Sequence, residues 1–186
     1  MTGERGADLV AECLGRMTQR GETLGCAESL TGGAVAAAVV SVPGASRVFR
    51  GGVVSYATDV KISLLGVDAD LIAQCGTVDP HVAEAMARGV CRVLTCDWGV
   101  STTGVAGPGP AEGKEAGTAY VAVCGPRGAR PRRTSERASQ AGEGVVTVRA
   151  IQITGGRDEV RAGVVLAALS ELRARLEAMT VDDSPR

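Results

Sequence analysis

Aromatic residues are scarce in this chain. Its 186 residues include one Trp, two Tyr and one Phe, which make up 2% of the composition. A surface that binds single-stranded nucleic acid by stacking bases on aromatic rings is therefore not expected. Hydrophobic residues nevertheless make up 45% of the chain, and Ala and Val are prominent among them. A core of this kind depends on close packing of helices against a sheet rather than on large rings.

Histidine is almost absent, since His81 is the only one. A Ser-His-Asp triad would have to use His81, which follows Pro80 at the expected start of a helix and is more typical of a partly exposed first-turn residue. The cysteines form no C-x-x-C pair, so no metal site and no cofactor are predicted. We expect them to be reduced and buried as small hydrophobic residues; they are Cys13, Cys26, Cys75, Cys91, Cys96 and Cys124.

Neither a long apolar run nor an excess of one charge is present. The formal net charge is −1, which gives no general attraction to nucleic acid or to an anionic membrane. No apolar stretch approaches the roughly 18 residues of a membrane span, and the first residues lack the apolar segment of a secretion signal. The sequence therefore predicts a cytoplasmic protein without a membrane partner.

Helical and strand-like segments alternate along the chain. Apolar spacing and turn residues predict a helix–strand alternation that is typical of an α/β domain with a mixed sheet. Asp79 and Pro80 mark the start of one helix as N-cap and first-turn residue. The expected helices cover 7–20, 30–41, 60–65, 68–74, 80–94 and 157–179, and the expected strands cover 23–28, 48–57, 98–103, 117–124 and 145–153.

One segment differs from the rest in composition. Residues 125–144 hold two prolines and five arginines with little to bury, so we expect an exposed insertion in a single domain that covers 1–186. The tail at 180–186 is expected to be disordered. A basic loop could also contact nucleic acid, although a solvated loop is favoured; the arginines are Arg127, Arg130, Arg132, Arg133 and Arg137.

A hydroxyl and two glycines lie at a predicted strand-to-helix turn, in residues 27–33 with the sequence AESLTGG. Amide groups at the start of a helix lack partners within the helix and attract negative charge. Ser29 is therefore either a nucleophile beside an anion-stabilising turn or a simple N-cap. The turn alone leaves both interpretations open.

Four blocks in order resemble the CinA C-terminal-domain family. The first is AESLTGG at 27–33, and the second is GGVVSYA at 51–57 followed by Lys61 and LLGV at 64–67. The third is TGVAGP at 103–108 with Gly117 and Thr118, and the fourth is GRD at 156–158. The resemblance implies a three-layer α/β/α sandwich. The chain is similar to the stand-alone members, which include metal-independent nicotinamide-nucleotide amidases.

The resemblance also implies a reaction. Such amidases convert nicotinamide mononucleotide to nicotinate mononucleotide and ammonia. Ser29 matches the family nucleophile, Lys61 the proposed general base and Tyr56 the site tyrosine, in a Ser–Lys arrangement without histidine. Lys61 can act as a base only if burial or a nearby cation lowers its pKa. Without the resemblance, a strand-end Tyr and a solvated Lys would be the favoured interpretation.

The expected substrate contacts extend beyond that pair. Glycines let a ligand approach the backbone, and Arg157 at the start of the last helix could bind a phosphate. The alternatives are tight helix–sheet packing for the glycines, an ordinary β-branched strand residue for Thr103 and a surface arginine at the start of a helix for Arg157. The fourth block is altered, so a catalytically silent nucleotide-binding or partner-binding domain remains open, and a homodimer is the default assembly. The expected substrate-binding residues are Thr31, Gly32, Gly33, Thr103, Gly104 and Arg157.

Overall fold

A single mixed sheet of five strands forms the middle of the fold. The computed structural model describes residues 3–127 and 141–181. The strands lie in the order β2-β1-β3-β4-β5. β1 runs parallel to both of its neighbours, β2 and β3, whereas β4 runs antiparallel to both of its neighbours, β3 and β5. Their bounds are β1 Leu24–Glu28, β2 Phe49–Val54, β3 Trp98–Gly104, β4 Thr118–Gly125 and β5 Val145–Gln152.

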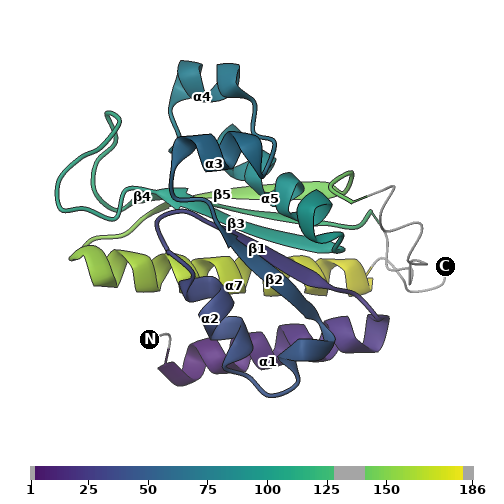
Figure 1. The fold of residues 1–186 in the computed structure, drawn as a ribbon. Helices are drawn as coiled ribbons and strands as arrows, with labels where there is room; N and C mark the ends of the chain where they lie inside the picture. The colour runs from purple at the N-terminus through teal and green to yellow at the C-terminus, as the bar shows by residue number, and fades with distance from the viewer. Residues whose placement is uncertain (1–2, 128–140, 182–186) are drawn as a thin grey trace.

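Helices cover both faces of the sheet, which confirms the predicted three-layer α/β/α arrangement (Figure 1). The helices α1 (Gly3–Arg20), α2 (Ala34–Val40) and α7 (Arg157–Val181) lie on one side. On the other side lie α3 (Thr58–Ser63), α4 (Ala69–Cys75) and α5 (Pro80–Leu94). A short 3-10 helix, η1 (Ala45–Arg47), precedes β2.

The connections explain why the sheet has two covered faces. The chain passes from β1 through α2 to β2 on one side of β1, and then through α5 to β3 on the other side. These two crossovers lie on opposite faces of the sheet (Figure 1). The direction in which successive strands are added therefore reverses between β1 and β3. In α/β sheets of this kind a crevice forms outside the carboxyl ends of the strands at the reversal.

Small residues hold α5 against the sheet. A Cβ atom added at Gly99 would lie 2.3 Å from the Ala87 carbonyl oxygen, and one added at Gly89 would lie 2.1 Å from that of Leu65. Trp98 is fully buried, and its indole Nε1 donates to the Glu22 carboxylate at 2.8 Å. The core therefore combines close backbone approach with one large ring, in line with the scarcity of aromatics.

Some element ends differ from the predictions. The helix predicted from residue 30 begins at Ala34, because Gly32 and Gly33 adopt positive φ angles of 61° and 95° in a turn. The helix predicted over 60–65 begins at Thr58. Asp79 does cap α5, accepting a hydrogen bond from the His81 amide as predicted.

The predicted insertion at 125–144 falls mostly on residues 128–140, which lie outside the described residues. Its described ends are more buried than expected. Pro126 and Gly144 are buried, and Arg88 donates to the carbonyls of Gly142 and Gly144 at 2.8 and 2.9 Å. Of the tail predicted to be disordered at 180–186, Val181 ends α7 and residues 182–186 lie outside the described residues.

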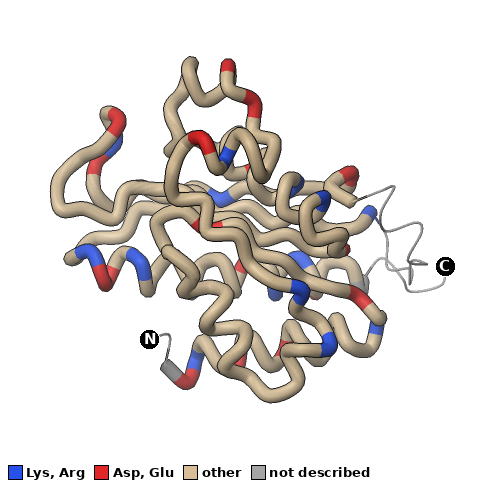
Figure 2. The backbone as a smooth tube through the Cα atoms, viewed as in Figure 1, with Lys and Arg blue, Asp and Glu red and all other residues tan. Residues whose placement is uncertain are grey.

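Charges of both signs are interspersed along the described chain (Figure 2). The start of α7 is an example, since Arg157, Asp158, Glu159 and Arg161 follow within five positions. No helix among the described residues is both long enough and apolar enough to cross a membrane. The cysteines are free thiols, and all except the half-buried Cys75 are buried.

Candidate active site

The predicted catalytic residues meet at the carboxyl ends of β1 and β2, beside the strand-order reversal. Glu28, the last residue of β1, pairs with Val54 of β2 on one side and with Thr102 of β3 on the other. Ser29 and Ser55 follow β1 and β2 directly, so their positions are fixed by the register of the sheet. This places them where α/β sheets bind ligands.

The structure brings Ser29 and Lys61 together. The Lys61 Nζ lies 3.2 Å from the Ser29 Oγ. It also donates to the backbone carbonyls of Ser55 at 2.7 Å and Tyr56 at 3.2 Å. Of the six residues of α3, all of which are described, Lys61 alone is buried. A helix that buries only its lysine holds that amine for a reason other than packing.

These partners suit either protonation state, since a protonated amine can donate to all three oxygens. A neutral amine has two N–H donors and one lone pair, and the two carbonyls accept from the N–H groups. The lone pair then faces the Ser29 hydroxyl and can accept its proton. Burial lowers the pKa of Lys61 below its ordinary value, and the charge of Glu112 opposes this in part. Lys61 is thus suited to act as a base towards Ser29.

Glu28 caps α2 from within the site. Its carboxylate accepts hydrogen bonds from the amides of Gly33, Val35 and Ala36 at 2.8–3.0 Å. It also accepts from the Thr31 hydroxyl at 2.7 Å. Glu28 is only 1% exposed, so the negative charge that the start of α2 attracts is supplied by the protein itself.

This cap changes the interpretation of the AESLTGG turn. Thr31 is fully buried, and because its hydroxyl donates to Glu28, the Thr102 hydroxyl donates to Thr31 at 2.7 Å. The Gly33 amide is taken by Glu28, and the Gly32 amide by the Ser29 carbonyl at 3.1 Å. The groups expected to contact a substrate here are engaged in holding the turn.

A cavity of about 250 Å³ has Tyr56 in its wall, although neither Ser29 nor Lys61 lines it. Tyr56 links the cavity to the Ser29–Lys61 pair. Its carbonyl accepts from Lys61, and its side chain, which is 63% exposed, lines the cavity. The Tyr56 hydroxyl accepts from the Arg157 Nη2 at 3.3 Å, not from Lys61. The remaining wall residues are Thr77, Val78, Gly104, Val105, Ala106, Gly107, Pro108, Gly109, Pro110, Ala111, Glu112 and Arg157.

Two of the predicted substrate-binding positions lie at this cavity. Arg157 lines it and donates from Nη1 to the Gly107 carbonyl at 2.6 Å. Gly104 lines it too, and a Cβ there would lie 2.6 Å from the Thr118 carbonyl oxygen of the neighbouring strand. Thr103 is fully buried, and its hydroxyl donates to the Thr77 carbonyl at 2.7 Å rather than to Lys61.

Comparison with known proteins identifies the family of this chain. Residues 6–141 match the family model of the CinA C-terminal domain. The chain belongs to this family. It is 43% identical over 176 residues to a CinA-like protein of Frankia casuarinae, and 41% identical over 173 residues to one of Synechocystis sp.. These matches cover 94% and 92% of the chain but only 37% and 38% of the two relatives.

Solved CinA-family structures share the fold. The competence/damage inducible protein of Agrobacterium tumefaciens is 29% identical, with a TM-score of 0.81 and coverage of 95% of this chain and 98% of that one. A CinA superfamily protein of Enterobacter cloacae is 24% identical, with a TM-score of 0.80 over 92% of each chain. The recognised family and its α/β/α fold are therefore confirmed for this chain.

Arg161 is a residue of this CinA domain to which the sequence analysis assigned no role. Its guanidinium donates to the carbonyls of Leu30 at 3.2 Å and Thr31 at 2.9 Å, so it ties α7 to the turn that carries Ser29. The signal was its position four residues after Arg157, on the same side of a helix.

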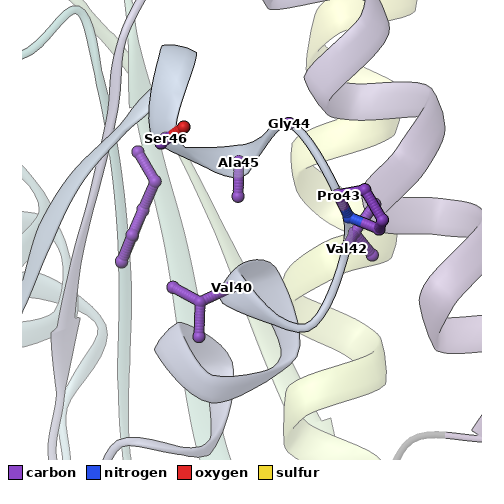
Figure 3. A pocket seen from close by; sticks show the side chains of 7 residues that line it. Val40, Val42, Pro43, Gly44, Ala45 and Ser46 are labelled. Atoms are coloured by element: carbon purple, nitrogen blue, oxygen red, sulfur yellow. The ribbon is translucent and has the colours of Figure 1, made fainter.

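A second cavity, of about 350 Å³, lies away from the predicted site (Figure 3). It is formed between the end of α2 and the turn that leads through η1 to β2. Val40, Val42, Pro43, Gly44, Ala45, Ser46 and Phe49 line it. None of these was predicted to be a site residue, and none contributes a titratable group.

Proposed function

We propose that this chain is an amidohydrolase that converts nicotinamide mononucleotide to nicotinate mononucleotide and ammonia. The observation that carries the proposal is the buried Lys61 amine, which is held by two backbone carbonyls and lies 3.2 Å from the Ser29 hydroxyl. A Ser–Lys pair of this kind suits acyl transfer from an amide without histidine or metal.

The reaction proceeds in two steps. In the first, Lys61 accepts the Ser29 proton while the Ser29 Oγ attacks the carboxamide carbon. The protonated Lys61 then passes its proton to the leaving nitrogen, so that ammonia departs and an ester remains on Ser29. In the second, Lys61 takes a proton from water and the resulting hydroxide attacks the ester. Lys61 then returns the proton to the Ser29 oxygen as nicotinate mononucleotide is released.

The cavity beside the pair supplies the rest of the substrate site in this proposal. Arg157 uses two of its N–H groups on Gly107 and Tyr56, and its planar guanidinium has further donors for a phosphate. Tyr56 fixes the orientation of Arg157 while its carbonyl positions Lys61. Gly104 contributes backbone to the cavity wall, and its lack of a side chain allows the close approach of β4.

The test is ammonia release from nicotinamide mononucleotide by the wild type and by three variants. Ser29→Ala and Lys61→Met should each lose at least about a thousandfold in kcat, because each removes one half of the nucleophile pair. His81→Ala is the control, since His81 is exposed on α5. Mass spectrometry after rapid quenching should find an acyl adduct on Ser29. Full activity in Ser29→Ala would refute the mechanism.

A binding domain without catalysis is the second candidate. It is favoured by the fact that the chain spans under two fifths of the curated relatives it matches, so the activity of those longer proteins need not reside in this part. Calorimetric binding of the nucleotide without ammonia release would support this alternative. We also propose a cytoplasmic homodimer, which light scattering and cell fractionation test directly.

A further inference from the structure

The loop between β3 and β4 is fastened to the segment after α4 by one carboxylate. Glu112 accepts hydrogen bonds from the Thr77 amide at 2.6 Å and from the Thr77 hydroxyl at 2.8 Å. Its backbone adopts a positive φ of 51°, which is uncommon outside glycine and has an energetic cost. The position of this carboxylate is therefore maintained by its contacts and not by local backbone preference.

The surrounding residues are adapted to this contact. A Cβ at Gly76 would lie 2.5 Å from the Glu112 Oε2, so a side chain at that position would displace the carboxylate. The Thr77 carbonyl accepts from the Thr103 hydroxyl at 2.7 Å. Thr77 thus connects two parts of the structure. It binds the cavity loop through Glu112, and it binds the end of β3 through Thr103. We call these three residues the Thr77 joint.

The joint also places a charge near the reaction centre. Glu112 lines the same cavity as Tyr56 and Arg157. Its negative charge raises the pKa of Lys61, in opposition to the larger effect of burial. A nearby carboxylate favours the protonated form of a lysine.

Other charged groups near Lys61 are directed elsewhere. Glu28 at the end of β1 binds the start of α2, and Arg157 binds Gly107 and Tyr56. Asp59 on α3 and Glu112 are both exposed, and Glu112 is the charge that acts on the Lys61 amine. The atoms bonded to the Lys61 Nζ are neutral oxygens of Ser29, Ser55 and Tyr56.

We propose that Glu112 is a positioning residue of this site, which fastens the cavity loop to Thr77 and holds one negative charge in the cavity wall that Tyr56 also lines. The proposal rests on the proposed amidase function for its kinetic consequences. Its effect is to balance the lysine between its two roles, as a base towards Ser29 and as an acid towards the leaving nitrogen. Without the charge, Lys61 would give up its proton at lower pH.

The test separates the charge from the fastening. Glu112→Gln removes the charge but keeps an oxygen acceptor and a similar shape. Thr77→Val removes the hydroxyl bond to Glu112 but keeps the charge, the Thr77 amide bond and the carbonyl that accepts from Thr103. Both are compared with the wild type in the pH dependence of kcat/KM for nicotinamide mononucleotide.

We expect the acid limb of the Glu112→Gln profile to move to lower pH. One unit below the wild-type midpoint, the variant should retain at least about twice the wild-type fraction of its own maximal kcat/KM. Thr77→Val should lower kcat/KM without moving the limb. An unmoved limb in Glu112→Gln, or an equal movement in Thr77→Val, would overturn the proposal.

A measurement independent of turnover distinguishes this failure from failure of the proposed function. The ¹³Cε chemical shift of Lys61, followed by NMR against pH, reports its protonation even in an inactive protein. It should titrate at lower pH in Glu112→Gln than in the wild type and at unchanged pH in Thr77→Val. Equal titration midpoints in Glu112→Gln and the wild type would refute the role of Glu112 whether or not the protein releases ammonia.

Discussion

Replacement of Glu28 by alanine should destabilise the protein more than any single change at the reacting pair. The carboxylate accepts four hydrogen bonds, and two of the donors, the Thr31 hydroxyl and the Val35 amide, are buried. The other two, from Gly33 and Ala36, are partly buried, so water can replace part of what they lose. A buried donor left without a partner costs about 1–3 kcal/mol.

The expected loss for Glu28→Ala is therefore about 3–5 kcal/mol, after allowance for the carboxylate that no longer has to be buried. Glu28→Gln should lose less, about 1–2 kcal/mol, because its oxygen can still accept from the three donors that share the Oε2 position. The free energy of unfolding of a domain is only about 5–15 kcal/mol, so Glu28→Ala removes a large part of it.

Urea unfolding followed by Trp98 fluorescence measures this difference. Trp98 is the single tryptophan and is fully buried, so its emission reports the folded state. With a slope of about 2 kcal/mol per molar urea, the midpoint of Glu28→Ala should fall by roughly 2 M. Ser41→Ala is the control at the other end of α2, where the exposed hydroxyl bonds to the Ala38 carbonyl, and it should shift the midpoint little. Equal midpoints in Glu28→Ala and Ser41→Ala would refute the assignment of Glu28 as the cap.

Three further results are expected. The pKa of Lys61 is lowered in the folded state, so unfolding takes up a proton at any pH between the folded and unfolded pKa values. The stability of the wild type should therefore rise with pH across that range relative to that of Lys61→Met. Parallel melting temperatures of the two proteins across pH 7–10 would contradict this. Arg157→Lys should raise the KM for nicotinamide mononucleotide about tenfold with a smaller change in kcat, in steady-state ammonia assays, since lysine lacks the planar fork. Gly117→Ala should lower the free energy of unfolding in urea by about 2–4 kcal/mol, because the new Cβ would lie 1.9 Å from the Ile153 carbonyl oxygen at a φ of +88°. Gly113→Ala is the matched control, since Gly113 has a φ of +69° and a Cβ there would have no neighbour within 4 Å.

The strands and most helices could be predicted because their signals are local. Asp79 and Pro80 mark the start of α5 within two residues, and the alternation of apolar runs with glycine turns marks the sheet. The start of α2 was predicted too early, since the sequence does not reveal that Gly32 and Gly33 take positive φ values. The 3-10 helix η1 was not predicted, because three residues are too few to show a period.

The site was predicted less evenly. Ser29 and Lys61 are 32 positions apart, and their contact followed from resemblance to a family rather than from spacing. The role of Glu28 depends on the start of a helix several residues later, and that of Glu112 on a hydrogen bond across 35 positions. Contacts of this kind are decided by how the sheet brings distant segments together, which no local pattern contains.

The Ser29–Lys61 pair and most of the cavity wall come from separate stretches of the chain, although Tyr56 belongs to both. Ser29 and Lys61 both belong to the first crossover unit, from β1 to α3, whereas Glu112 and Arg157 enter from β3 onwards. Mutation can therefore reshape the second stretch while the first is left intact, and the same Ser–Lys pair can be inherited with different cavity walls. For relatives of this chain, a shared serine and lysine are evidence for a common reaction, and the later segments are where ancestral and modern substrates would have diverged.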